Sequence, residues 1–221
     1  MKIGPVSLGC WIAFAAGMYA QEMPAWPDTY VARLQALALV QTLNAEVLAS
    51  RSATLTLEAW CRDHRLAKEP AILAEVVRGA AKAPVTEQRQ RLEVGPETEI
   101  KYRRVRLRCG DRVLLEADNW YVPERLTVEM NRLLDTTATP FGKVVQALEP
   151  YRRTFAVKLL WSPLPEGWER GSIAAPAGEG PLAIPEALFE HRAVLYTREH
   201  KPFSEVDEIY ERPLLAFRPP R

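Results

Sequence analysis

Residues 100–122 constrain the fold most strongly, because they read as two alternating strands joined by a tight turn. The first run places Tyr102, Arg104, Arg106 and Arg108 on one face and Arg103, Val105, Leu107 and Cys109 on the other. The turn Cys109-Gly110-Asp111-Arg112 then leads into a partner strand over 113–122. This pattern predicts a β-hairpin and therefore an antiparallel sheet.

Outside this hairpin, the spacing of apolar residues predicts helices before the sheet and short helices inserted between its strands. Asp28 is a good N-cap, and apolar residues recur at helical spacing from there to Ser50. Further helices are expected over 57–64, 71–77, 127–134 and 140–148, and further strands over 85–94, 154–161, 192–197 and 206–210. Five prolines and four glycines between Ser162 and Pro185 predict a long loop. This order of elements predicts the α+β class, with about six antiparallel strands wrapped by helices.

Composition removes several classes of function. The chain has 221 residues, 48% of them hydrophobic, and a formal net charge of +1, so it lacks the overall field that would steer it to nucleic acid. Its three cysteines and three histidines lack metal-ligand spacing, and no glycine-rich nucleotide motif is present. We therefore expect no metal, no cofactor and no nucleic-acid partner.

Residues 1–20 have the order of a secretory signal: one lysine, an apolar stretch from Val6 to Tyr19, and a small residue at Ala20. The stretch is short for a membrane span, so we expect cleavage near Ala20, a periplasmic or secreted protein, and no stable membrane insertion. The alternatives are a buried N-terminal helix, or a cytoplasmic chain that begins at Met18 or Met23.

Cleavage would leave Cys61 and Cys109 as the remaining cysteines, in a compartment where a disulfide can form. Nothing in the sequence shows that their Cα atoms approach within about 7 Å, so we expect two buried free thiols.

Two kinds of side chain in the predicted sheet are candidates for ligand binding or catalysis. A guanidinium on a rigid strand, such as that of Arg104, can hold a carboxylate through two hydrogen bonds. The alternative is that this arginine row is exposed to solvent and pairs with strand neighbours such as Glu116. In the last strand, alternation directs either Asp207 or Glu208 inward, where a carboxyl could act as an acid or base, or pair with an arginine across the ladder.

In order along the chain, four short segments resemble landmarks of the chorismate pyruvate-lyase family. They are 102–110, Asn119-Trp120-Tyr121-Val122-Pro123, Thr139-Pro140-Phe141-Gly142-Lys143 and Lys201-Pro202. The resemblance covers about residues 55–215, within a domain that we expect to span 21–221. It implies the family's antiparallel sheet, with two helical flaps that close an internal cavity.

The resemblance also implies an activity, the elimination of pyruvate from chorismate to leave 4-hydroxybenzoate, a step in ubiquinone biosynthesis. Carried over residue by residue, the family's site implies that Arg104 and the backbone of Phe141, with Gly142 beside it, bind the ring carboxylate. Glu208 then takes the place of the catalytic glutamate, although a count without gaps selects Asp207. Asn119 stands where the family has an arginine, and that departure weakens the case for chorismate.

The main alternative is a protein of the same fold that binds a small aromatic or carboxylic acid without turnover. The same architecture is known from effector-binding domains of bacterial regulators, and an exported chain would not meet chorismate, a cytoplasmic metabolite. On either reading we expect a monomer whose partner is a small aromatic carboxylate.

Overall fold

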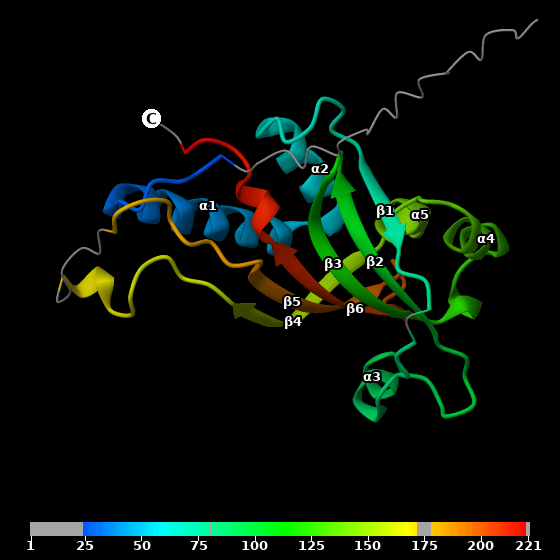
Figure 1. Ribbon diagram of the computed structural model, residues 1–221. Helices are drawn as coiled ribbons and strands as arrows, with labels where there is room; N and C mark the ends of the chain where they lie inside the picture. The colour runs from blue at the N-terminus through cyan, green and yellow to red at the C-terminus, as the bar shows by residue number, and fades with distance from the viewer. Residues whose placement is uncertain (1–23, 80, 172–177, 220–221) are drawn as a thin grey trace, which may run out of the picture.

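A computed structural model describes residues 24–79, 81–171 and 178–219, and its centre is a six-stranded sheet (Figure 1). The strand order is β1-β2-β3-β6-β5-β4, and every neighbouring pair is antiparallel. The strands are β1 Ile72–Val76, β2 Lys101–Cys109, β3 Arg112–Tyr121, β4 Tyr151–Leu159, β5 Ala187–Tyr196 and β6 Pro202–Glu211. This arrangement confirms the predicted α+β class and the predicted hairpin at Gly110.

Helices pack mainly on one face of the sheet, which we call the inner face. Buried side chains of α1 and α2 join those of the strands in the largest apolar cluster, and α4 and α5 join a second cluster over the end of the same face. The helices are α1 Tyr30–Ala49, α2 Ala53–Asp63, α3 Thr86–Arg91, α4 Val128–Thr136 and α5 Phe141–Val144. Short 3-10 turns are η1 Pro123–Arg125, η2 Val145–Leu148, η3 Trp168–Arg170 and η4 Arg212–Leu215.

Specific caps and anchors fix the helices against the sheet. The N-cap of α1 is Thr29, whose side chain accepts a hydrogen bond from the amide of Ala32, while Asp28 pairs with Arg33 instead. The indole of Trp60 donates to the carbonyl of Leu214 at 3.0 Å, which ties α2 to the segment after β6. Among the helices of the described residues, none has both the length and the apolar character to cross a bilayer.

Two predicted elements have the opposite structure. Residues 71–77 form the edge strand β1, because Ile72 and Ala74 turn inward while pairing with β2, and this pairing overrides a helix-forming composition. Residues 85–94 contain the helix α3, which begins where the amide of Val85 donates to the side chain of Gln88 at 2.9 Å. Both predictions were wrong for the same reason, since runs of this length carry little periodicity.

The prediction of two free thiols is also wrong. Cys61 in α2 and Cys109 at the end of β2 form a disulfide, with their Cα atoms 6.3 Å apart. The bond joins the helical layer directly to the sheet. The expected signal segment, residues 1–20, lies outside the described residues.

Candidate functional site

A largely apolar cavity lies between the inner face of the sheet and the starts of α2 and α5. Its walls include Val105, Leu107, Ala117, Phe141, Val145 and Val206. The cavity volume is about 60 Å³, well below the roughly 150 Å³ that accommodates a benzene ring. A few polar side chains also reach this space, and they determine what it can hold.

Arg103 is the most unusual of these side chains. It lies on the inner face of β2, opposite Asn119 of β3, and it is only 7% exposed. None of its three guanidinium nitrogens donates to an acceptor among the described residues. Burial lowers the pKa of the Arg103 guanidinium. Because buried polar groups are almost always hydrogen-bonded, this arrangement suits an anion that enters the cavity.

The first turn of α2 reaches the same cavity. Ser52 is the N-cap, yet its side chain makes no capping bond, and its buried Oγ has no partner within the described part of the chain. Ser52, Ala53 and Thr54 line the cavity. Arg51 lines it as well, and this residue is exposed to solvent. The first amides of a helix have no intrahelical acceptor and carry partial positive charge, so this end of α2 adds to the anion-binding character of Arg103.

Phe141 and Gly142, which the resemblance assigns to the carboxylate site, line the cavity. α5 begins at Phe141, directly after Pro140. A Cβ on Gly142 would lie 2.7 Å from Ser52 Oγ and 3.0 Å from Thr54 Oγ1. The glycine therefore lets α5 approach the start of α2 closely enough to complete the wall.

Glu208 also faces the cavity, but its carboxylate is engaged. Arg152 of β4 binds both of its oxygens, at 3.0 and 2.7 Å, and Tyr210 donates a further hydrogen bond at 3.0 Å. The pair is buried, with the two side chains 3% and 8% exposed. Burial disfavours the charged form of Arg152, but Glu208 outweighs that cost and raises the pKa of the guanidinium.

His191 of β5 lies close to the Arg152–Glu208 pair. It is fully buried, and its Nε2 lies 2.6 Å from Oδ1 of Asn44 in α1. Burial, followed by the nearby charge of Arg152, lowers the pKa of His191 to about 4. The imidazole is therefore neutral at ordinary pH, and its Nε2–H donates to Asn44.

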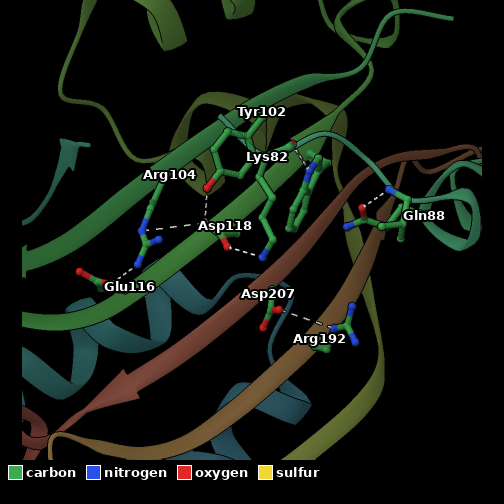
Figure 2. Close-up of polar contacts among 10 residues, drawn as sticks. Lys82, Gln88, Tyr102, Arg104, Glu116, Asp118, Arg192 and Asp207 are labelled. Atoms are coloured by element: carbon green, nitrogen blue, oxygen red, sulfur yellow. Dashed lines mark hydrogen bonds and ion pairs between the residues drawn. The ribbon is translucent and has the colours of Figure 1, made fainter. Parts of the chain in front are cut away.

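Asp207 lies on the outer face of the sheet, where Arg192 Nε is 3.7 Å from its Oδ2 (Figure 2). Of the two carboxylates that strand alternation left open, Glu208 is therefore the one that points inward. The alternative, an acid that pairs with an arginine across the ladder, describes Asp207, which lies opposite Arg192 of β5. Glu208 instead pairs with Arg152 of β4, two strands away.

The expected orientation of Arg104 needs correction, because its side chain lies on the outer face. Its Nη2 donates to Glu116 at 2.8 Å, and Asp118 in turn binds Lys82 and the Tyr102 hydroxyl (Figure 2). The arginine row is thus a solvent-facing ladder of ion pairs, which was the alternative interpretation. The alternation defined the two faces correctly, and the face that meets the helices is the one with Arg103, Val105 and Leu107.

Sequence reasoning missed two cavity residues, Arg103 and Arg152. Arg103 was assigned to the same strand face as Val105 and Leu107, and these apolar neighbours were the signal that the face is buried. Arg152 sits beside Arg153 at the start of β4, and nothing local distinguishes which of the two turns inward. Asn119 lies on the inner face and accepts a hydrogen bond from Ser204 at 2.6 Å, so the cation that the family has at this position is absent.

Comparison with known proteins gives one strong match in sequence. No family model matches the chain. It is 50% identical over 196 residues to the uncharacterized protein y4mC of Sinorhizobium fredii, which covers 88% of this chain and 83% of the relative.

Similarity to solved structures is much weaker. The effector domain of PhnF from Mycobacterium smegmatis has a TM-score of 0.46 at 11% identity, covering 72% of this chain and 88% of that domain. The gene product SA0254 of Staphylococcus aureus has a TM-score of 0.42 at 16% identity, covering 68% and 89%. We derive nothing about function from likenesses at this level.

Proposed function

The chain belongs to the family of the uncharacterized protein y4mC, whose name assigns no activity, so we propose a function from the cavity itself: binding of a small organic acid. The carboxylate of the acid would meet the Arg103 guanidinium and the first turn of α2. The apolar side chains of the sheet and α5 would cover the rest of the ligand.

The observation that carries this proposal is the buried guanidinium of Arg103. A charged group held out of water without a partner costs several kcal/mol, so a fold retains one mainly where a ligand supplies the missing charge. A planar guanidinium also matches a carboxylate through two parallel hydrogen bonds. Ser52, Ala53 and Thr54 of the first turn of α2 line the same cavity, where the Ser52 hydroxyl and the first amides of the helix would supply further donors.

The binding test compares Arg103→Ala with the matched control Arg106→Ala. Arg106 lies on the outer face, where it pairs with Glu116 at 2.5 Å and is 44% exposed. Calorimetric titration with propionate should show weaker binding to Arg103→Ala by about 10-fold or more, because hydrogen bonds to charged groups contribute roughly 1.5–3 kcal/mol. The Arg106→Ala variant should bind like the wild type. Unchanged affinity in Arg103→Ala would refute the proposal.

The elimination of pyruvate from chorismate is the second function that we consider, because Glu208 lines the cavity as the lyase resemblance implies. Two features favour binding over turnover. Arg152 and Tyr210 already engage the Glu208 carboxylate, and the cavity of about 60 Å³ is smaller than a ring requires. Incubation of the purified chain with chorismate, followed by absorbance measurement of 4-hydroxybenzoate, distinguishes binding from turnover. We expect no 4-hydroxybenzoate to form.

We also propose that the protein works in the periplasm or outside the cell. The Cys61–Cys109 disulfide supports this proposal, because such bonds persist in oxidising compartments and are rare in the cytosol. N-terminal sequencing of the natural protein tests it. A mature chain that begins at Gln21 fits the proposal, whereas a chain that begins at Met1, Met18 or Met23 contradicts it.

A further inference from the structure

A second hollow adjoins the cavity, and Arg103 lines both. This groove has a volume of about 800 Å³ and lies between the end of β1, the first half of β2 and the end of α4. β1 pairs with β2 only from Val105 onward, and beyond it the amide of Val77 binds the carbonyl of Arg104. The edge of β2 from Lys101 to Arg103 therefore forms the floor of the groove, next to the enclosed cavity.

The groove carries an excess of positive charge. Arg78, Lys101, Arg103 and Arg104 line it, against Asp135 as the one lining carboxylate. Arg104 is neutralised by Glu116 on the outer face. Arg78 is exposed and has no ion pair or hydrogen bond within the described residues, and Lys101 makes only a long, solvent-exposed contact of 3.3 Å with Asp135. Arg78 and Lys101 are thus available to a second anion.

The sizes of the two hollows suggest how a ligand would be shared between them. The cavity of about 60 Å³ has room for little more than an acid head group, whereas the groove of about 800 Å³ has room for a longer chain. Arg103 is a lining residue of both hollows. A molecule whose first carboxylate meets Arg103 could extend along the β2 edge toward Lys101 and Arg78.

We propose that the groove is a second anion-binding subsite and that the ligand is an elongated organic diacid. Its second carboxylate would contact Lys101 and Arg78 and would replace Asp135 as the partner of Lys101. This inference rests on the proposed function, because it takes the first carboxylate to be bound at Arg103.

The test uses adipate and hexanoate, which have equally long carbon chains and differ only in the second carboxylate. Titrated at low ionic strength, wild-type protein should bind adipate about 10-fold more tightly than hexanoate, as expected for two partly exposed charge contacts. The double variant Arg78→Ala/Lys101→Ala should lose this preference while keeping its affinity for hexanoate. The control Arg108→Ala, which removes an outer-face arginine paired with Glu75 at 2.6 Å, should keep the preference.

The variant Asp135→Asn should change the affinity for adipate in the opposite direction. Removing the carboxylate that competes for Lys101 should tighten adipate binding several-fold and leave hexanoate unchanged. Equal affinity for the two acids in the wild type, or a preference that survives the double variant, would overturn the groove assignment while leaving the Arg103 site intact. Binding of neither acid would overturn the proposed function as well.

Discussion

Three charged side chains on the inner face share one cavity but differ in how their charges are balanced. Glu208 and Arg152 neutralise each other through two hydrogen bonds, whereas Arg103 has no such partner among the described residues. Tyr210 completes the pair, and burial together with the Glu208 charge keeps the pKa of its hydroxyl well above the ordinary value, so it remains a donor. The balanced pair therefore needs no ligand, whereas the unbalanced guanidinium is free to bind one.

Breaking the balanced pair should destabilise the protein strongly. Arg152→Met leaves the Glu208 carboxylate buried without its cation, and we expect the free energy of unfolding in urea to fall by about 3–5 kcal/mol. Arg152→Met/Glu208→Leu removes both charges and should lose less than the sum of the single variants. Additive losses in this double-mutant cycle would contradict direct coupling between the two groups.

The candidate site could be predicted from the sequence only in part. Phe141, Gly142 and Glu208, which the family resemblance named, line the cavity, although the count for Glu208 left Asp207 as an alternative. Arg104 was chosen in place of Arg103 because the family's strand arginine was carried over onto Arg104, and the apolar neighbours that Arg103 has on its own face were not used as a sign of burial. Burial along β2 follows the predicted alternation without a break, with Arg103, Val105, Leu107 and Cys109 all buried.

At the scale of elements, the site depends on how closely α5 approaches α2. Gly142 allows this approach, and Lys143 adds an ion pair with Glu58 of α2. Both helices contribute cavity wall, so a change in their spacing alters the cavity without touching Arg103. The contact between α2 and α5 is therefore a structural determinant of ligand affinity.

Gly142→Ala should weaken binding of propionate and lower stability, because its Cβ would lie 2.7 Å from Ser52 Oγ. Overpacking of this kind typically costs about 1–3 kcal/mol. Gly95→Ala is the matched control, since a Cβ at that glycine meets nothing within 4 Å. Calorimetry and urea unfolding of both variants check the prediction, and equal behaviour of the two would argue against close packing at Gly142.

The elements themselves were predictable where their periodic runs are long. The helix α1 and the hairpin of β2 and β3 were expected at nearly their observed positions, since each repeats its pattern over several turns or residue pairs. β1 was mistaken for a helix because Ile72–Val76 is short and takes its structure from pairing with β2. α3 was mistaken for a strand because its six residues are defined by a local cap and not by an apolar face.

At the scale of the whole molecule, the disulfide joins the two parts that build the anion site. α2 carries Ser52 to Thr54, and β2 carries Arg103, while Cys61 and Cys109 link these two elements and are fully buried. The bond spans 48 residues of sequence, which include β1 and α3. It therefore restrains a large part of the unfolded chain.

The variant Cys61→Ala/Cys109→Ala should be less stable than the oxidised wild type by about 4 kcal/mol, from the loss of that restraint. Urea unfolding with and without a reductant checks the value, because the reductant should lower the stability of the wild type and leave the variant unchanged. An unaltered midpoint on removal of both cysteines would show that the bond contributes nothing to the folded chain.

The most direct measurement is a crystal structure of the protein grown with a small carboxylic acid such as propionate. We expect electron density for the carboxylate in the cavity, with its oxygens about 2.7–2.9 Å from the Arg103 guanidinium nitrogens and within reach of the first amides of α2. Density for the acid at the outer-face arginines alone, or an Arg103 side chain paired with a carboxylate of the protein, would contradict this expectation.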